Sequence, residues 1–399
     1  MATGLVKNIS MGGSGWFHSG PAYTNSVLYA DNYVNNPAVL YYSGALTVSV
    51  WVDWWQFQGE ESSNWPVPTN YAQSWQQLEA QNSKWALLDQ EIATLIMGGK
   101  YPIIRFYHRF PKWARYQGTP PAARLKPEHA LPVNTAVDGP WAWFVAYVMC
   151  RYKYGVPQNG RGPHYPSAGE SVNAAFYGNP SGAWTWGLAP MNEINLVCWG
   201  YRNRAEQTAE MIRTADAYAA AFGSPLVLFV PEMSDVPRKS LDGSENVPEG
   251  SYPYDTYAAG LLTNLQGWVP SSVVVWSHHN YFDVKYRSQP GESYTVSHAW
   301  DIRAQLYAKA WKGASADRYI YISEGTYDIY AEIVAGRPEA EAANEQRYWS
   351  ERNFQNMKAM PDVVMFSTHT IRDGGTFWSG LYTVGGQRRD WGAVFPGLS

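Results

Sequence analysis

The sequence predicts an α/β protein: a (β/α)8 TIM barrel with long βα loops and a degenerate last helix, in one domain covering residues 1–399. Short runs rich in β-branched and aromatic residues alternate with longer segments of helical periodicity, which is typical of βα units around a parallel sheet. A length of 399 residues fits one barrel with long loops. No repeat, low-complexity tract or linker divides the chain.

The strands are predicted from short apolar runs bounded by polar or turn residues. The first strand is expected near residues 5–12, and a poorly defined segment follows it through about residue 43. The other runs have the β-branched and aromatic composition of buried strands. They cover residues 46–52, 102–107, 184–190, 225–230, 272–277, 318–323 and 362–367.

Helical periodicity fills the gaps between these strands. The predicted helices cover residues 82–98, 140–154, 204–222, 254–267, 298–312 and 338–359. Gly155, Gly223 and Gly313 each follow one of them, as left-handed helix caps do.

The segment after residue 370 carries glycine pairs on both sides of residues 376–384, which predicts a hairpin in place of a full last helix. Long loops at 114–139, 156–182 and 232–253 are expected to build the wall of a cleft.

Composition excludes several classes of function. The net charge of -4 and the scatter of Lys and Arg give no basic stripe for nucleic acid. Met1 to Ser14 lack the basic start and apolar run of a signal peptide or membrane helix, so we expect no membrane segment here; the cellular compartment stays open. Cys150 and Cys198 cannot form a disulfide framework and lack zinc-site spacing, so each is expected to be a buried thiol.

Two glutamates end two of the predicted strands. Residues 191–194 read Met-Asn-Glu-Ile after the fourth strand, and residues 322–325 read Ile-Ser-Glu-Gly at the end of the seventh. The side chains at the carboxyl ends of parallel barrel strands share one cleft. Glu193 and Glu324 are therefore expected to face each other, and a carboxylate pair is the minimum machinery for breaking a glycosidic bond.

At these residues the chain resembles the retaining glycoside hydrolases of clan A, which have (β/α)8 barrels. In that clan an acid/base glutamate follows an asparagine at the end of strand 4, and the nucleophile glutamate ends strand 7. After the sixth strand, His279-Asn-Tyr281 matches the clan's His-x-Tyr pattern, and the resemblance as a whole covers roughly residues 85–325. Stretches similar to family 39 and its neighbours, including family 5-like enzymes, lie at 85–90, 99–104, 111–113 and 144–152.

The chain departs from the clan pattern in two places. His369 follows the eighth strand where many members have a tryptophan, and Ile194 follows the Asn-Glu pair where proline is commoner. His369 could occupy the place of that tryptophan, or face solvent.

The resemblance implies that Glu324 is the nucleophile and Glu193 the acid/base. A retaining enzyme holds these carboxyl groups ~5–5.5 Å apart, one ionised and one protonated. The ionised group raises the pKa of its neighbour, so that one site holds an acid and a base. Asn192 could donate to the sugar 2-hydroxyl, and Tyr281 could hydrogen-bond Glu324.

Further residues are predicted to line the cleft. His278 and His279 point to opposite faces of their strand, so they cannot form a two-histidine metal site, and His279 is expected to face the cleft. Arg105 and His108 could bind hydroxyls or an acidic sugar, although a solvated rim or internal ion pairs would explain them too. Glu232 could bind a hydroxyl.

Aromatic residues are unusually abundant, with 20 Trp and 29 Tyr, which is more than a core of this size requires. Trp113, Trp199 and Trp378 lie in loops beyond predicted strands, where a flat ring could stack on a sugar. Each could also be a core residue.

The leading hypothesis is a monomeric retaining hydrolase that cleaves a β-linked oligosaccharide or polysaccharide in endo fashion, without metal or other cofactor. The alternatives are a non-catalytic carbohydrate-binding barrel and an exo-acting glycosidase on a short or acidic oligosaccharide. A metal-dependent hydrolase would need several converging His and Asp ligands, and the early strands lack a His-x-His pair. The sugar itself stays open.

Overall fold

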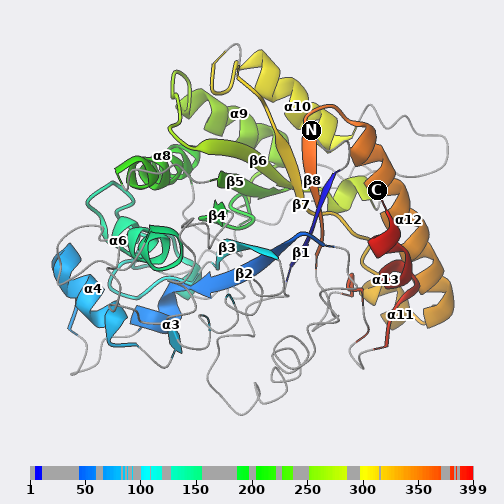
Figure 1. Cartoon of the computed structure of the whole chain (residues 1–399), viewed down its shortest axis with the longest axis horizontal. Coiled ribbons are helices and arrows are strands. Elements are labelled where there is room, and N and C mark those ends of the chain that lie inside the picture. The colour runs from blue at the N-terminus through cyan, green and yellow to red at the C-terminus, as the bar shows by residue number, and fades with distance from the viewer. Residues whose placement is uncertain are drawn as a thin grey trace.

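In the computed structural model, eight parallel strands close a barrel in sequence order, and helices surround it (Figure 1). The strands are β1 (Val6–Ser10), β2 (Thr47–Asp53), β3 (Tyr101–Tyr107), β4 (Gly187–Ala189), β5 (Val227–Ser234), β6 (Val273–His279), β7 (Ile320–Glu324) and β8 (Val363–Thr368). Pairing of β1 with β8 completes the ring. The predicted TIM barrel is confirmed.

The structure describes the barrel and most of its helices. The described residues are 5–10, 45–59, 66–81, 84–85, 88, 92, 100–107, 109–118, 127–154, 187–196, 204–221, 227–236, 251–284, 297–313, 316–369, 378–381, 383 and 387–398. All structural statements below concern these residues. None of the helices among them is long and apolar enough to cross a membrane.

Alternation along the strands separates two apolar layers. One set of side chains forms a small cluster inside the barrel: Ile103, Ala189, Phe229, Val275, Tyr321 and Met365. Their strand neighbours point outward because successive strand residues face opposite sides, and these outward residues join the large core beneath the helices. Two residues further along β3 and β6, the interior positions are polar: Arg105 and Ser277. The barrel interior therefore changes from apolar to polar towards the carboxyl ends of the strands.

The helices differ from the predicted ones mainly in length. They are α3 (Trp54–Gln58), α4 (Tyr71–Glu79), α6 (Pro140–Met149), α8 (Ala205–Ala221), α9 (Tyr254–Asn264), α10 (His298–Ala308), α11 (Tyr330–Val334), α12 (Glu339–Ala359) and α13 (Asp390–Val394). One π-helical segment, Cys150–Tyr154, continues α6, and 3-10 turns lie at Pro127–His129 and Phe395–Gly397. Of the predicted helix 82–98, only residues 84, 85, 88 and 92 are described, and all four are helical.

Two helices that the periodicity did not predict are formed by capping. The Asp53 carboxylate accepts the Trp55 N–H at the start of α3, and the Asn70 amide oxygen accepts the Gln73 N–H at the start of α4. Such caps satisfy backbone donors that have no partner within the helix. Helix α3, with five residues, has too few turns for a periodic signal.

Strand β5 runs four residues beyond its predicted end at 230. Proline usually ends a central strand because it has no N–H for the ladder. Here the pairing of β5 with β6 shifts register between Val230 and Met233, so Pro231 lies in a bulge. This extension brings Glu232 into the end of the barrel.

The chain after β8 contains a last helix of only five residues, α13, as predicted. The predicted hairpin at 376–384 lies partly outside the described residues. Its second half folds back, since the Thr383 N–H donates to the Gln387 carbonyl and the Arg389 N–H donates to the Leu381 carbonyl. Cys150 is buried, as expected, and Cys198 lies outside the described residues.

Candidate active site

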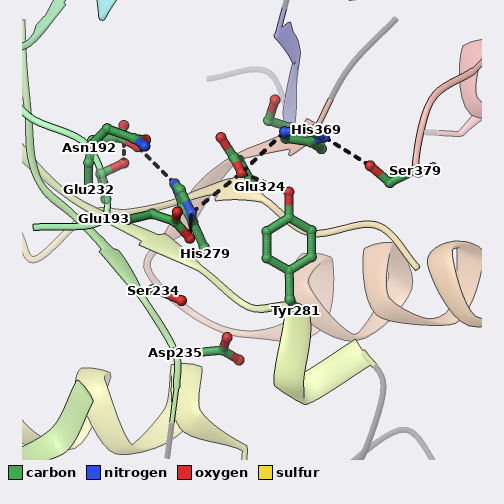
Figure 2. Close-up of polar contacts among 12 residues, drawn as sticks. Asn192, Glu193, Glu232, Ser234, Asp235, His279, Tyr281, Glu324, His369 and Ser379 are labelled. Atoms are coloured by element: carbon green, nitrogen blue, oxygen red, sulfur yellow. Dashed lines mark hydrogen bonds and ion pairs between the residues drawn. The ribbon is translucent and has the colours of Figure 1, made fainter. Parts of the chain in front are cut away.

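Polar side chains from six consecutive strands meet at the carboxyl end of the barrel, and Figure 2 shows those that belong to β4 through β8. They are Arg105 from β3, Asn192 and Glu193 after β4, Glu232 from β5, His279 and Tyr281 at the end of β6, Glu324 from β7 and His369 after β8. Strand pairing places these side chains at similar levels along the barrel axis, because His279 pairs with Ser234 of β5 on one side and with Glu324 of β7 on the other. The predicted convergence of Glu193 and Glu324 on one site is observed.

The His279 ring lies between the two glutamates. Its Nδ1 is 3.2 Å from Glu193 Oε1 and 3.5 Å from Glu324 Oε2. These two carboxylate oxygens therefore lie no farther apart than the sum of those distances. That limit includes the ~5–5.5 Å of retaining glycosidases.

Glu324 is held as an anion by its neighbours. Tyr281 donates its hydroxyl to Oε2 at 2.7 Å, and Arg105 Nη1 lies 3.1 Å from Oε1. Burial by itself would raise the pKa of Glu324, but the charges of His279, His369 and Arg105 and the Tyr281 hydrogen bond outweigh it and lower that pKa to about 2. An ionised carboxylate at the cleft is what a nucleophile requires.

Glu193 has a different environment. Its side chain is 14% exposed, compared with 6% for Glu324, and its carboxylate contacts the His279 ring. The backbone of Glu193 has a φ of 40°, a left-handed conformation that is strained for a residue with a Cβ. Residues held in such conformations are often part of functional sites.

Asn195 fixes the loop that carries Glu193, and sequence reasoning missed it. Its amide nitrogen donates to the carbonyls of Ser234 and Tyr252 at 3.0 and 3.1 Å, and its amide oxygen accepts the Ser234 N–H at 2.9 Å. The side chain is buried. One asparagine thus ties the loop after β4 to the end of β5. Its position, three residues after Asn192, gives no sequence signal of this role.

A buried ion pair lies behind the two glutamates. Arg105 Nη2 donates to Glu232 Oε2 at 2.6 Å and to Asn192 Oδ1 at 2.9 Å, while the Ser277 hydroxyl donates to Glu232 Oε1 at 2.5 Å. The side chains of Arg105 and Glu232 have no exposed surface. Both were predicted to bind substrate, but their contacts and burial favour an indirect role through the residues in front of them.

Trp51 supports this ion pair from the side, and it was not predicted as a site residue. Its ring lies under the Arg105 guanidinium, with 4.5 Å between the guanidinium carbon and the ring centroid. Stacking on an aromatic face restrains the planar guanidinium without using its donors.

His369 lies beside the nucleophile candidate, where many clan A members have a tryptophan. Its Nδ1 is 2.9 Å from the Ser379 hydroxyl and its Nε2 is 3.7 Å from Glu324 Oε2. Burial lowers the pKa of this imidazole, and the nearby Glu324 carboxylate opposes that shift. The side chain is 22% exposed, so it borders the open part of the site.

The predicted tryptophan platforms receive no support from their described contacts. Trp113 packs edge-on against Trp54 and donates its Nε1–H to the Gln58 carbonyl, and Trp378 packs edge-on against Tyr330. Trp199 lies outside the described residues, and so does His108.

A second polar cluster lies close by, made of Asp235, Asp283 and His298. All three are buried, and their potential metal-ligand atoms lie within 4.8 Å of one another. Backbone N–H groups already occupy the carboxylates: Phe282 and Asp283 donate to Asp235, and His298 and Ala299 donate to Asp283. These bonds fasten the ends of β5 and β6 to the start of α10, so the cluster has a structural explanation without an ion.

No protein-family model and no curated protein sequence matches the chain. Solved structures do share its fold. One is a monomeric β-xylosidase from Caulobacter crescentus CB15, with a TM-score of 0.50 and 14% identity over 98% of this chain and 68% of that one.

Two further structures have the same barrel. A GH39 enzyme from Xanthomonas axonopodis pv. citri gives a TM-score of 0.50 and 13% identity over 98% of this chain and 65% of its own. A GH5_18 protein from Bifidobacterium longum subsp. longum ATCC 55813, in complex with Manβ1-4GlcNAc, gives a TM-score of 0.53. Its sequence is 12% identical over 98% of this chain and 77% of its own. The chain thus spans about two thirds of the length of the β-xylosidase and of the GH39 enzyme. At this identity the likeness establishes the fold, and the neighbours that share it are glycoside hydrolases.

Proposed function

We propose that this protein is a retaining glycoside hydrolase that cleaves a β-linked glycan by double displacement. Glu324 is the nucleophile and Glu193 the acid/base. The observation that carries the proposal is the position of His279 Nδ1 between oxygens of both carboxylates, at 3.2 and 3.5 Å. The shared barrel of neighbouring glycoside hydrolases supports the reaction class.

In the first step Glu324 attacks the anomeric carbon, and a C–O bond forms to the carboxylate as the glycosidic bond breaks. Glu193 gives its proton to the leaving oxygen. The ion pair with Arg105 and the Tyr281 hydrogen bond keep Glu324 ionised before the attack. The ester then holds the sugar with inverted configuration.

In the second step Glu193, now a carboxylate, removes a proton from water, and the water oxygen attacks the same carbon. The bond to Glu324 breaks, and the second inversion restores the original configuration. Asn192 presents its amide oxygen to Arg105, and its NH2 group donates to the sugar 2-hydroxyl as positive charge develops.

Hydrolysis of aryl β-glycosides and polysaccharides by wild type and Glu324→Gln tests this function. We expect kcat/KM to fall at least ~10³-fold in the variant, because no carboxylate remains to form the ester. NMR of the first product should show the β-anomer. Glycan binding without hydrolysis by the wild type would instead support a carbohydrate-binding barrel, and an α-anomer would contradict retention.

The same proposal includes endo action, a monomeric state and chemistry without a metal ion. Product sizing on polysaccharides distinguishes endo from exo action, and light scattering checks the expected monomer. Activity that persists in a chelator would be consistent with chemistry carried by the two carboxylates alone.

A further inference from the structure

Glu232 contacts several residues of the candidate active site from behind, although its side chain has no exposed surface. Its Oε2 contacts Arg105 Nη2 at 2.6 Å and His279 Nε2 at 3.1 Å, and its Oε1 accepts from Ser277. Arg105 in turn contacts Glu324, and His279 contacts both Glu193 and Glu324. Each catalytic carboxylate is therefore one intermediate residue away from Glu232.

The Glu232 carboxylate decides the state of the facing His279 nitrogen. Arg105 Nη2 carries two hydrogens. Three acceptors lie within reach of them: Glu232 Oε2 at 2.6 Å, Asn192 Oδ1 at 2.9 Å and His279 Nε2 at 3.2 Å, so the two oxygens are the closer ones. An ionised carboxylate only accepts. A lone pair on His279 Nε2 would face this negative charge at 3.1 Å, so Nε2 carries a hydrogen and donates it to Glu232.

The ionised state of Glu232 follows from its partners. Burial would raise its pKa, but Arg105, His279 and the Ser277 hydroxyl together lower it. With the Nε2 hydrogen in place, the opposite nitrogen Nδ1 faces Glu193 Oε1. A single proton between Nδ1 and Oε1 can reside on either atom, as Glu193 acid beside a neutral ring or as Glu193 carboxylate beside an imidazolium.

We propose that Glu232 is a positioning residue: by accepting the Nε2 hydrogen it fixes the protonation of His279, so that His279 Nδ1 and Glu193 share the proton used in general acid catalysis. This inference rests on the proposed function for its catalytic meaning. The proton passes from Nδ1 or Oε1 to the leaving oxygen in the first step, and the water proton replaces it in the second. No other reactant is needed.

Several charged or titratable groups lie around His279. They are Arg105 from β3, Glu193 after β4, Glu232 from β5, Tyr281 after β6, Glu324 from β7 and His369 after β8, together with His278, its neighbour along β6. Among the described residues, Glu232 supplies the acceptor at Nε2, whereas Glu193 and Glu324 lie at Nδ1. Loss of the Glu232 charge should therefore change the protonation of His279 at Nε2, where neither Glu193 nor Glu324 lies.

Histidine 15N NMR on the full chain tests the proposal without any substrate. The His279 signals are assigned by their loss in His279→Gln. In the wild type, Nε2 should stay protonated across the accessible pH range. In Glu232→Gln, the midpoint at which the ring loses its positive charge should fall by ~1–3 pH units, the effect of removing one opposite charge at hydrogen-bond distance.

Ser277→Ala is the matched control, because it removes a buried hydrogen bond to Glu232 but keeps the carboxylate. Its midpoint should not fall. If Glu232→Gln does not fold, as judged by circular dichroism, Glu232→Asp replaces it, and its shorter side chain should lower the midpoint by a smaller amount. An unchanged His279 midpoint in a folded Glu232 variant would overturn the proposal.

A second measurement separates this inference from the proposed function. If both hold, the alkaline limb of the kcat/KM profile moves down in Glu232→Gln by a similar amount to the NMR midpoint. A moved midpoint in a protein that hydrolyses no glycan would reject the proposed function alone. A moved midpoint with an unmoved alkaline limb would reject the shared proton.

Discussion

At the scale of single residues, the site separates two chemically identical glutamates by their surroundings. Glu324 accepts the Tyr281 hydroxyl and lies beside Arg105, whereas Glu193 contacts the imidazole of His279. The first environment stabilises negative charge strongly, and the second can supply or withdraw a proton. When the surroundings of two carboxyl groups differ in this way, one group can act as the nucleophile and the other as the acid/base.

Tyr281→Phe should raise the pKa of Glu324, because the hydrogen bond that stabilises the carboxylate is lost. The nucleophile is then protonated at higher pH, so the acid limb of kcat/KM should move upward. At neutral pH we expect a loss of about 10- to 100-fold, as for a hydrogen bond to a charged group. The profile is measured from pH 3 to pH 8.

Tyr254→Phe is the control for this change. It loses a phenol hydrogen bond of 2.5 Å to Asp301, away from both glutamates, and should leave the acid limb in place. Equal shifts in the two variants would show that Tyr281 acts through general stability and not through Glu324.

At the scale of elements, the register of β5, β6 and β7 places the site. Shifts between Val230 and Met233, and between His278 and His279, move the last residues of these strands relative to their neighbours. Glu232 then has a φ of 52°, in the left-handed region, and faces the barrel interior. Neither shift has a sequence signature beyond Pro231.

Asn195→Ala should loosen the loop after β4, because three hydrogen bonds to Ser234 and Tyr252 are lost and buried backbone groups are left unpaired. We expect the protein to lose about 2 to 4 kcal/mol of stability. The value of kcat should fall more than KM rises, since Glu193 loses its fixed position. Urea unfolding and steady-state kinetics measure the two effects.

Asn264→Ala serves as the comparison for Asn195. It removes an amide hydrogen bond to the Gly260 carbonyl at the end of α9, remote from the site. It should cost less stability and leave kcat unchanged. A normal kcat in a folded Asn195→Ala protein would argue against the positioning role of this loop.

At the scale of the whole molecule, the two ends of the described chain are joined. The Lys7 ammonium on β1 donates to the carbonyls of Phe395 and Pro396 in the 3-10 turn after α13 and of Leu398 just beyond it. The five-residue helix α13 is too short to cover the barrel alone, and this contact holds it against β1. Burial lowers the pKa of Lys7, so the contact is strongest where the lysine is still charged.

Lys7→Met should lower the thermal midpoint, because it removes the cation from three carbonyl oxygens while keeping the aliphatic stem. We expect about 1.5 to 3 kcal/mol of lost stability. Activity per folded molecule at 25 °C should stay the same, since Lys7 is distant from the catalytic residues in the fold. Lys309→Met, at an exposed position, should change neither quantity.

The barrel and the two glutamates could be predicted because their signals are local. Val-rich runs and helical periodicity reveal the order of elements, and in a parallel barrel that order alone brings the carboxyl ends of strands together. The tryptophans show the limit: Trp113 and Trp378 are in loops as predicted, but the sequence could not distinguish a platform from the packed positions they occupy.

By itself, the sequence determined that this chain forms a (β/α)8 barrel and that Glu193 and Glu324 lie at one end of it. Only the tertiary structure decided that His279 lies between them, that Glu232 lies buried against Arg105, and that Asn195 holds the loop. Strand formation depends on neighbouring residues, whereas hydrogen-bond partners depend on register shifts and left-handed turns that segments distant in sequence impose on one another.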